Sequence, residues 1–359
     1  MKLHIFNPEH DMALAYDKDY LTLPHNIQEL RTNLGFLPAL WADDGDCVLV
    51  DDIAYATKAL VQTGLPHNDV LFINEGELQK IYIADVEPWG WDKVVRKRLA
   101  EAGIRDNILP SEERLAAMRL LSSRMHNSEV LAFVRNGIEA QTCGRCECAS
   151  SIGNIESYMQ RYGKIVVKAP WSSSGRGIRY VSGNITTSLK GWIQNIIATQ
   201  GYVTMEPYYN KVLDFAMEFR ISGKYKVDYC GLSLFKTDKG NYTGNVIATE
   251  EEKTRMLSKY VDEPLLTIVR KRLADYFSRK FMGIYEGYFG VDLMAVARDD
   301  GDGYLLHPCV EVNLRRTMGH AANSIKASDS QPVRMMRIVH DVNYRLKFDK
   351  LDVEYVKTI

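Results

Sequence analysis

Short apolar runs alternate with longer amphipathic stretches in the first third of the chain. Segments with the length of buried strands occupy residues 3–6, 47–50 and 70–73, and segments with helical spacing occupy residues 26–40 and 53–62. Because strands that alternate with helices build parallel sheets, this rhythm predicts a parallel βα domain. We expect this first domain to cover residues 1–108.

A different pattern begins after residue 108. The sequence Leu109-Pro-Ser-Glu-Glu predicts a helix that runs to about Met125, because Pro and Ser favour a helix start and acidic side chains favour its first turn. A second helix is predicted at residues 128–136, before Gly137. Further strands are predicted at residues 165–169, 177–181, 202–206, 215–221, 225–236, 242–248, 289–297 and 304–312, and further helices at residues 187–199, 264–282 and 332–345.

These segments predict two α+β lobes after the first domain. The expected bounds are residues 109–205 for one lobe, 206–330 for the other, and 331–359 for a C-terminal helix or tail. The fold class is therefore α/β, with α+β lobes following an N-terminal parallel βα domain.

The composition narrows the classes of protein. Of the 359 residues, 46% are hydrophobic and 25% are charged, which is ordinary for a globular protein. The formal net charge of −1 argues against a sequence-independent nucleic-acid binder, which carries a basic excess. No apolar run approaches the roughly 18 residues needed to cross a bilayer, and the N-terminus lacks the apolar core of a signal peptide. We expect a cytoplasmic protein without nucleic-acid or membrane partners, and a homodimer is the oligomer we consider.

Three of the six cysteines lie together, in Cys143-Gly-Arg-Cys146-Glu-Cys148. Their spacing resembles half of a zinc or iron–sulfur site. A closed tetrahedral site needs a fourth ligand, and no second Cys-x-x-Cys occurs in the sequence. We favour a reduced cluster on a loop, and whether it binds anything stays open.

One segment combines the groups that hold a polyphosphate. Within residues 164–181 an apolar run ends in Lys168, a Ser/Gly stretch follows, and a second apolar run begins at Ile178, which predicts strand, loop and strand. Glycine lets backbone N–H groups approach an oxyanion closely, while hydroxyls add donors and basic side chains add charge. The loop residues concerned are Ser172, Ser173, Ser174, Gly175, Arg176 and Gly177. By itself the segment is also compatible with an ordinary polar hairpin turn.

A purine-binding edge is predicted downstream of this loop. An apolar strand ends in Glu206-Pro207, where Pro207 stops strand pairing because it has no N–H. Backbone groups at such an edge suit the amine of a purine, and apolar side chains suit its faces. Asp214 follows and has the chemistry to accept hydrogen bonds from ribose hydroxyls. The alternative is that Asp214 and Glu218 are solvent-facing carboxylates of a strand.

Acidic residues also stand within two apolar strands near the C-terminal end. Asp292 lies in one, and Glu311, Asn313 and Arg315 lie in the other. Side chains repeat every two residues along a strand, so Glu311 and Asn313 share a face, and Asp292 joins them if the strands are adjacent. Arg315 would point the same way if the strand continues that far. Two carboxylates and an amide oxygen form a hard oxygen set that suits Mg²⁺ shared with phosphates. A structural salt bridge between Glu311 and Arg315 is the alternative.

In this order, the elements resemble the ATP-grasp superfamily of ADP-forming ligases. The order is a Lys before a Gly-rich loop, a hinge Glu, a ribose acid, and then an acid followed by a Glu-x-Asn pair. The resemblance covers roughly residues 110–325, and the βα segment before it resembles the preATP-grasp domain. Glu311-Val-Asn-Leu-Arg315 is similar to the Glu-x-Asn-x-Arg version of the biotin carboxylase and purine-biosynthesis branches. No Walker, dinucleotide-binding or protein-kinase motif competes with this assignment.

The resemblance implies ATP and Mg²⁺ as cofactors. The residues it assigns to the nucleotide are Lys168 and the Ser172–Gly177 loop for the phosphates, Glu206 and neighbours such as Tyr208 for adenine, Asp214 for ribose, and Lys236 for the γ-phosphate. It assigns Asp292, Glu311 and Asn313 to one or two Mg²⁺. Arg315 would stabilise the acyl phosphate or the tetrahedral intermediate, as a cation aimed at developing negative charge.

Some positions depart from the family pattern. A second phosphate-side Lys is common near the start of the ATP-grasp domain, and Arg124 stands at the most similar place, where it would neutralise phosphate with a different geometry. The ribose acid is Asp214, where the longer Glu is usual. The residues that follow Arg315, including Arg316 and His320, match no branch, which leaves the substrate open.

A polar group also follows the first predicted strand, at the edge where open α/β sheets bind ligands. It consists of Asn7, Glu9, His10 and Asp11. Together with Arg316 and His320, these residues are candidates for substrate recognition, and His10 is a candidate general base. Alternatively, Asp11 caps the helix that follows.

The activity implied by the resemblance is that of an ATP- and Mg²⁺-dependent ligase. Such an enzyme activates a small carboxylate as an acyl phosphate and joins it to an amine or a thiol, with release of ADP and phosphate. Arg315 and Lys168 would be its catalytic residues. A small-molecule kinase on the same fold and a catalytically silent ATP-binding or regulatory protein are the alternatives.

Overall fold

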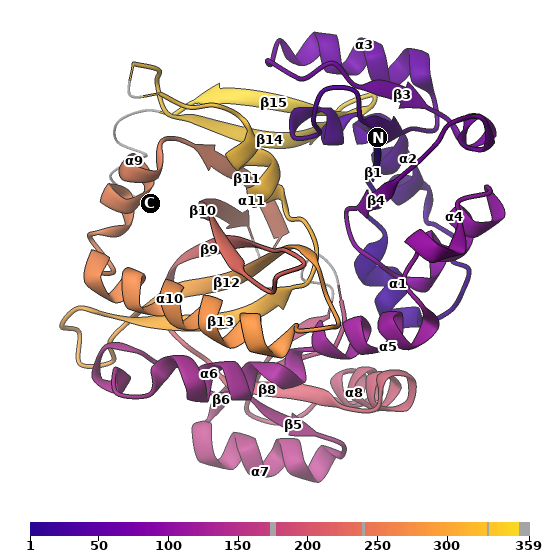
Figure 1. The fold of residues 1–359 in the computed structure, drawn as a ribbon. Helices are drawn as coiled ribbons and strands as arrows, with labels where there is room; N and C mark the ends of the chain where they lie inside the picture. Colours follow the sequence, from indigo (N-terminus) through magenta and orange to yellow (C-terminus); the bar gives the residue numbers. More distant parts are fainter. Residues whose placement is uncertain (173–176, 239–240, 329, 352–359) are drawn as a thin grey trace.

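The computed structural model describes residues 1–172, 177–238, 241–328 and 330–351. Figure 1 shows the N-terminal residues in indigo and purple on one side of the molecule, the large sheet beside them, and a small lobe with α7 and α8 at one end. Three sheets organise the fold, and each belongs to one of these units.

The N-terminal unit is a four-stranded sheet in the order β3-β2-β1-β4, and all its pairings are parallel. Its elements are β1 (Lys2–Ile5), α1 (His10–Tyr16), α2 (His25–Leu34), β2 (Cys47–Leu49), α3 (Ile53–Thr63), β3 (Leu71–Ile73), β4 (Asp85–Pro88) and α4 (Lys93–Glu101). The side chains of Leu3 and Ile5 on the central strand are buried in its core. The predicted parallel βα domain is confirmed. The helix predicted at 26–40 is divided, because Gly35 ends α2 and Pro38, which has no N–H, lies in the 3₁₀ turn Leu37–Leu40.

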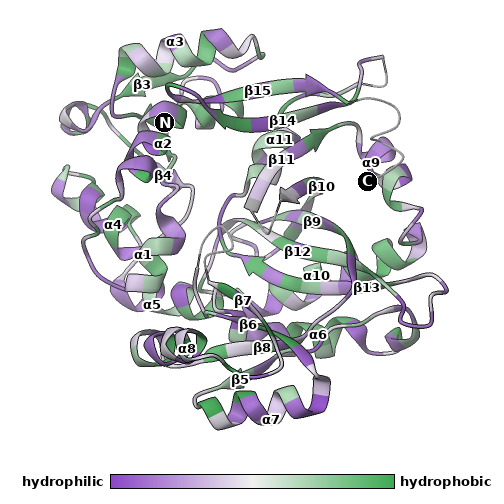
Figure 2. Cartoon of the chain, turned by 180° about the vertical axis from the view of Figure 1, so that it is seen from behind, coloured by the Kyte–Doolittle hydropathy of each residue, from purple (hydrophilic) through white to green (hydrophobic). Residues whose placement is uncertain are grey.

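The small lobe is a second sheet, with strand order β5-β8-β6-β7. Its strands are β5 (Glu147–Ala149), β6 (Lys164–Lys168), β7 (Ile178–Ser182) and β8 (Val203–Pro207), and α7 (Ile152–Tyr162) and α8 (Thr187–Gln200) cover it. Figure 2 shows hydrophobic and hydrophilic positions on different sides of α7, as a helix packed on one face requires. Ile155 and Tyr158 of α7 pack against Ile165 and Val167 of β6.

The large sheet has seven strands, in the order β13-β12-β9-β10-β11-β14-β15. Its strands are β9 (Lys211–Ile221), β10 (Val227–Asp238), β11 (Asn241–Ile247), β12 (Gly287–Ala297), β13 (Tyr304–Asn313), β14 (Arg334–His340) and β15 (Tyr344–Lys350). The associated helices are α5 (Glu112–Leu121), α6 (Asn127–Arg135), α9 (Glu250–Leu257), α10 (Glu263–Lys280) and α11 (Met318–Ser324).

The two faces of this sheet differ in what covers them. Phe219 and Val291 belong to the hydrophobic core with Val269 and Leu273 of α10. Residues one position along each strand point the other way, so Glu218 and Asp292 lie on the opposite face. Helix α11 packs on that face against β10 and β9. The sheet therefore has one apolar face and one face that carries polar chemistry.

The C-terminal segment corrects one prediction. Residues 332–345 are expected to be helical, but β14 and β15 form an antiparallel hairpin whose first strand pairs with β11. The physical reason is the open edge of β11: pairing with it buries Met335 and Met336 completely, which a free helix would not do. The segment 331–359 therefore includes the edge of the large sheet, as far as the structure describes it.

The helix predicted to run to Met125 also ends early. Helix α5 stops at Leu121, and a 3₁₀ turn, Arg124–His126, follows. The hydroxyl of Ser123 accepts a hydrogen bond from the Met125 N–H, which is a local alternative to helical pairing. This turn directs Arg124 toward the site described below.

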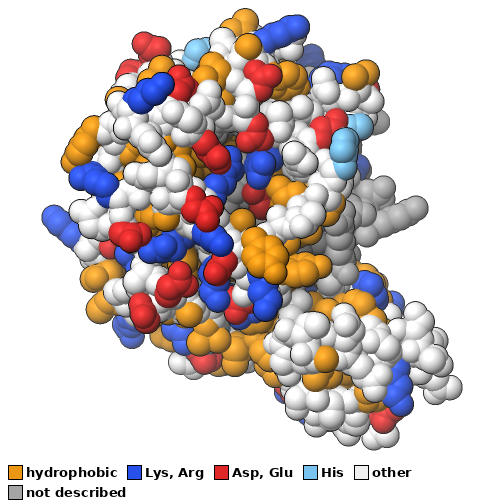
Figure 3. Space-filling view, turned by 90° about the vertical axis from the view of Figure 1, so that its right-hand side faces the viewer, with side chains coloured by type: hydrophobic (Ala, Val, Ile, Leu, Met, Phe, Trp, Pro, Cys, Tyr) orange, Lys and Arg blue, Asp and Glu red, His pale blue; other side chains and the backbone are white. Residues whose placement is uncertain are grey.

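None of the helices in the described part of the chain is both long enough and apolar enough to span a bilayer. The face drawn in Figure 3 carries basic and acidic side chains side by side around a hollow, without a continuous patch of one sign.

Candidate functional site

Lys168 and Glu206 form a buried ion pair in the small lobe. Lys168 ends β6 and Glu206 lies near the end of the neighbouring strand β8. The Lys168 Nζ is 2.7 Å from each Glu206 carboxylate oxygen, and both side chains are almost fully buried. The predicted phosphate ligand and the predicted hinge residue therefore lie in direct contact.

Arg124 connects the small lobe to the large sheet. Its Nη1 donates hydrogen bonds to the Ala169 carbonyl oxygen at 2.6 Å and to the Ser172 Oγ at 2.9 Å, and its Nη2 donates to Glu311 at 2.5 Å. Burial opposes the charge on Arg124, but the Glu311 carboxylate holds the pKa of Arg124 above its ordinary value. The guanidinium thus stays charged beside the first residue of the predicted phosphate loop.

Only the two ends of that loop are described. The Ala169 N–H donates to the Gly177 carbonyl oxygen at 2.8 Å, which closes the base of the β6–β7 connection. A Cβ on Gly177 would lie 2.2 Å from the Ser172 Oγ, so the base tolerates only glycine there. Ser173, Ser174, Gly175 and Arg176 lie outside the described residues.

The three predicted magnesium ligands are brought together on the large sheet. Asp292 is directly opposite Glu311, and Asn313 is opposite Gly290, two residues from Asp292 on the same strand. Burial raises the pKa of Asp292 well above its usual range, and the charges of Glu311 and Glu218 raise it further. A divalent cation would offset this charge repulsion, and two carboxylates with one amide oxygen are donors that fit Mg²⁺.

Arg315 follows Asn313 by two residues, and its side chain contacts the N-terminal unit. Its Nε donates to Asp11 Oδ1 at 2.9 Å and its Nη2 donates to Asp11 Oδ2 at 2.8 Å. Burial works against the charged carboxylate, but Arg315 holds the pKa of Asp11 below its ordinary value. The alternative pairing of Arg315 with Glu311 is wrong, because Glu311 pairs with Arg124.

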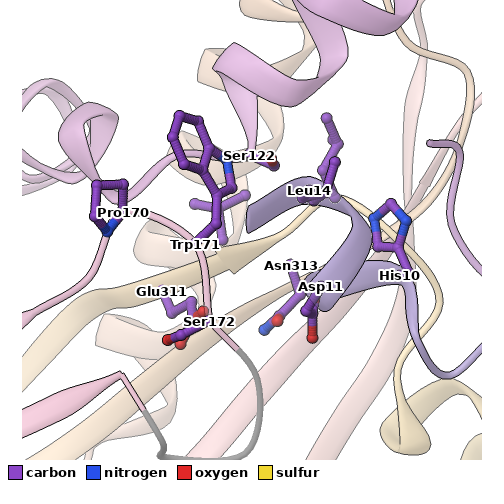
Figure 4. A pocket seen from close by; sticks show the side chains of 11 residues that line it. His10, Asp11, Leu14, Ser122, Pro170, Trp171, Ser172, Glu311 and Asn313 are labelled. Atoms are coloured by element: carbon purple, nitrogen blue, oxygen red, sulfur yellow. Dashed lines mark hydrogen bonds between the residues drawn. The ribbon is translucent and has the colours of Figure 1, made fainter. Parts of the chain in front are cut away.

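A small pocket lies where the three units meet (Figure 4). It is lined by His10, Asp11 and Leu14 of α1, Ser122 after α5, Pro170, Trp171 and Ser172 after β6, and Glu311, Val312, Asn313 and Leu314 of and after β13. Figure 4 shows side chains from α1, the β6–β7 connection and β13 converging on it. Residues far apart in the sequence thus enclose one space.

His10 is held beside this pocket by a residue that sequence reasoning missed. The His10 Nδ1 lies 2.9 Å from Asp92 Oδ2, and the other Asp92 oxygen accepts the Val95 N–H at the start of α4. The Asn7 amide donates to Asp92 Oδ2 at 3.3 Å and to the Gly90 carbonyl oxygen at 2.9 Å. A Cβ on Gly90 would lie 2.5 Å from the His10 ring, so glycine provides room for it. Asp92 is the N-cap of α4, and a capping residue after a strand is the sequence signal by which it could have been found. The preceding strand β4 is not evident in the sequence, so this signal was missed.

The remaining candidates for substrate recognition do not line this pocket. Asn7 supports Asp92, and Glu9 forms an ion pair with Arg31 at 3.2 Å. Arg316 pairs with Glu87 and stacks on the Tyr288 ring at 3.5 Å from its centroid. Of the N-terminal set, His10 and Asp11 alone are among the pocket residues.

His320 and Glu218 form a buried pair next to the magnesium set. His320 Nδ1 lies 3.0 Å from Glu218 Oε2, and the Thr317 hydroxyl donates to Glu218 Oε1 at 2.7 Å. The alternative that Glu218 faces solvent is wrong, because α11 covers it and only 1% of Glu218 is exposed. Glu218 lies opposite Gly290, so it shares the face of Asp292 and Asn313.

The predicted ribose and γ-phosphate residues lie further along this sheet. Asp214 is opposite Met294, accepts a hydrogen bond from Thr237 at 3.0 Å and pairs with Lys211. Lys236 is on β10, next to Thr237 in the chain, and its side chain is exposed. Tyr208, after β8, is partly exposed, and the Lys164 Nζ lies 3.3 Å from its ring centroid.

The cysteine cluster has no metal-site geometry. Cys143 and Cys146 are buried, whereas Cys148 is exposed. Burial raises the pKa of the Cys143 thiol to about 12, so that thiol stays protonated at neutral pH. Within the ranges that the structure describes, no three His, Cys, Asp or Glu side chains are grouped to hold a metal ion.

Comparison with known structures identifies the fold. Among solved structures, biotin carboxylase from Campylobacter jejuni in complex with β-γ-ATP is similar, with a TM-score of 0.50 and 12% identity, over 94% of this chain and 75% of that chain. The chain has the ATP-grasp fold. No protein-family model matches the sequence, and no curated protein does.

Two further structures are similar at the same level of identity. N5-carboxyaminoimidazole synthetase from Staphylococcus aureus complexed with ADP has a TM-score of 0.49 and 11% identity, over 94% of this chain and 82% of that chain. A putative ATP-grasp superfamily protein from Archaeoglobus fulgidus has a TM-score of 0.46 and 10% identity, over 98% of this chain and 100% of that chain. The predicted ATP-grasp fold and the predicted fold class are confirmed, and the chemistry rests on the residues of the site.

Proposed function

We propose that this protein is an ATP-dependent ligase that activates a small carboxylate as an acyl phosphate and joins it to an amine or a thiol. The observation that carries the proposal is the pocket between the three units. It combines Glu311 and Asn313 of the predicted metal set with Asp11, which anchors Arg315, and with His10. The ATP-grasp fold supports ATP as the second substrate.

Positive charge for the phosphates comes from two buried cations. Lys168 ends β6 immediately before the phosphate loop, and Arg124 contacts Ser172 at its first residue. Both are held by carboxylates, Glu206 and Glu311, so each is positioned before a nucleotide binds. Such preorganised cations stabilise the charge that develops on transferring phosphoryl groups.

Asp292, Glu311 and Asn313 would hold Mg²⁺, and its chemistry would be to neutralise phosphate charge. The nearby Glu311–Arg124 pair then links the metal set to the phosphate loop. Asp214 lies on the same face of the sheet, opposite Met294, which is two residues beyond Asp292 on β12. This position supports the assignment of Asp214 to the ribose end of the nucleotide.

The proposed reaction has two steps. A carboxylate oxygen of the acid attacks the γ-phosphorus, the bond to the bridging oxygen breaks, and ADP leaves. The amine nitrogen then attacks the acyl carbon, and the carbon–oxygen bond to phosphate breaks. Arg315, fixed by Asp11, stabilises the negative charge on the acyl oxygen.

His10 is proposed to take the proton that the amine loses. With its Nδ1–H donated to Asp92, the ring keeps Nε2 as the nitrogen that accepts a proton. Asp92 then stabilises the imidazolium that forms, and Asn7 holds Asp92 in place. A thiol nucleophile would use the same base.

A release assay tests the proposal. The full chain is incubated with Mg·ATP and pooled small carboxylic acids, amino acids and dipeptides, with and without a pool of amines, and ADP and phosphate are measured. Free phosphate that requires both an acid and an amine supports a ligase, whereas a stable phosphorylated product without the amine supports a kinase. Absence of ADP release in every pool contradicts both.

Variants connect the assay to the site. Glu311→Gln should reduce ADP release by at least about a hundredfold, because it removes the negative charge that pairs with Arg124 and that would also bind the metal. Glu156→Gln, on the exposed side of α7, is the matched control and should keep the parent rate. Equal rates for the parent and Glu311→Gln would place the activity elsewhere.

A further inference from the structure

A second, larger cavity lies between the N-terminal unit and the large sheet. Its volume is about 300 Å³, which is the lower end of the range for small-molecule sites. Strand β4 and the segment after it form one wall, residues 107–110 another, and the ends of β9 and β12 the third. Its lining includes two aromatic side chains and three arginines: Trp91, Tyr288, Arg114, Arg220 and Arg316.

The charges around this cavity are not balanced. Lys2 pairs with Glu87 at 3.2 Å, and Arg316 pairs with the same carboxylate. Arg114 and Arg220 have no carboxylate within ion-pair distance in the part of the chain that the structure describes. The Arg114 Nε donates to the Ile284 carbonyl oxygen at 2.7 Å, which leaves its terminal nitrogens for another acceptor.

The acidic residues on the lining do not neutralise these two arginines. Glu87 is shared by two cations, which, against the effect of burial, lower its pKa to about 2. Asp85 lies 3.9 Å from Lys2, and Glu286 is exposed, close to Gly223. One buried donor is also unpaired: Arg316 is only 4% exposed, and its Nε has no hydrogen-bond partner.

Aromatic side chains provide flat walls beside these cations. The Arg316 guanidinium lies 3.5 Å from the centroid of the Tyr288 ring, and the Arg220 guanidinium lies 5.3 Å from it. Trp89 and Trp91 line the cavity from the N-terminal unit. A ligand that combines a negative group with a planar apolar part would match both features.

The cavity is separate from the pocket of the proposed reaction. No residue lines both spaces. Arg315 and Arg316 are consecutive, yet Arg315 reaches Asp11 in the first pocket and Arg316 reaches Glu87 in the second. The Arg316 N–H also donates to the Trp89 carbonyl oxygen at 2.8 Å, so the same residue joins the two units that form the cavity.

We propose that this cavity is a binding site for a small organic anion, a carboxylate or phosphate monoester with a planar apolar part. Arg114 and Arg220 bind the anionic group, and Trp91 and Tyr288 contact the planar part. Arg316 lines the same cavity and is joined by a peptide bond to Arg315, whose guanidinium is assigned to the reaction. The site does not depend on the ligase activity.

Direct binding to the full chain tests the site. Phenyl phosphate and benzoate are titrated by calorimetry at constant ionic strength, with benzyl alcohol as the uncharged comparison. Saturable binding of at least one anion, and not of the alcohol, is expected. Arg220→Gln and Arg114→Gln should each weaken that binding by about tenfold or more, because each removes a charged hydrogen-bond donor. Arg345→Gln, on the exposed strand β15, should leave it unchanged.

Three results would overturn the proposal. They are no saturable binding of either anion, equal affinity for the parent and both arginine variants, or complete competition by ATP at one shared site. Arg220 is exposed, so its substitution leaves the fold intact, which a melting curve verifies. An anion that changes the KM for ATP without being consumed is an effector, which supports the site. Failure here leaves the ADP-release result unaffected.

Discussion

Arg315 and Asp11 form a bidentate salt bridge between the large sheet and the N-terminal unit. Their two hydrogen bonds measure 2.9 and 2.8 Å, and about a fifth of each side chain is exposed, 18% for Arg315 and 21% for Asp11. The guanidinium that the proposed reaction needs is therefore fixed before a substrate arrives. It is fixed by a carboxylate that lies about 300 residues away in the sequence.

Asp11→Asn should lower the free energy of unfolding by about 2 kcal/mol, because it leaves a largely buried guanidinium without its charged partner. Asp341→Asn, at an exposed pair with Arg345, is the comparison and should change the free energy of unfolding far less, because solvent screens that pair. Urea denaturation at pH 7 measures both. Equal values for the two variants would show that the Asp11–Arg315 contact contributes no more than a surface pair.

The same pair makes stability depend on pH. Arg315 lowers the pKa of Asp11 in the folded chain, so the stabilisation is present above the unfolded pKa and is lost as pH falls through the folded pKa. The parent should therefore lose stability more steeply than Asp11→Asn below about pH 4. The free energy of unfolding of both proteins is measured by urea denaturation at a series of acidic pH values. An equally steep decrease with falling pH in the two proteins would contradict this.

Lys168→Met should weaken binding of a non-hydrolysable ATP analogue by at least about tenfold. The substitution removes the charge assigned to the phosphates and also leaves Glu206 buried without its partner. Lys190→Met on the exposed surface of α8 is the control. A Lys168→Met protein that folds, as judged by its circular dichroism spectrum, and binds the analogue like the parent would remove Lys168 from the nucleotide site.

The sequence allowed the metal set to be predicted because the relevant information is local. The two-residue period of a strand puts Glu311 and Asn313 on one face, and adjacent strands then bring Asp292 opposite Glu311. The fold class could be predicted for the same reason, since β1, β2 and β3 of the first domain, and the helices α2 and α3 between them, each have their own hydrophobic pattern.

The contacts that could not be predicted are those that depend on tertiary packing. Glu218 lies in a strand and gives no local sign of burial, but α11 covers it and supplies Thr317 and His320 as partners. Asp92 follows a strand that is half polar because it lies at the edge of its sheet. The C-terminal hairpin likewise depends on the open edge of β11, and no pattern within residues 332–345 indicates that edge.

His10→Gln and Asp92→Asn should both reduce kcat by about a hundredfold or more, with little change in nucleotide affinity. His10 supplies the proposed base, and Asp92 is a positioning residue that fixes its tautomer. Because Asp92 acts through His10, the double variant should be no slower than His10→Gln alone. A double variant slower than His10→Gln by the full product of the two single effects would mean that the two residues act independently.

Asp292 should make magnesium binding depend on pH. Burial and the carboxylates of Glu311 and Glu218 raise its pKa, so the folded chain keeps a proton there that Mg²⁺ must displace. Without metal, this raised pKa destabilises the fold as pH rises from the unfolded pKa through the folded one. Saturating Mg²⁺ should therefore raise the Tm more at pH 8 than at pH 6. At a hundredfold excess of Mg²⁺ over its Kd, the total stabilisation by the metal corresponds to about 2.7 kcal/mol. Asp292→Asn should abolish the difference between the two pH values, while Asp228→Asn, at an exposed position of β10, should retain it. A Mg²⁺ effect of the same size in the parent and in Asp292→Asn would exclude Asp292 as a ligand.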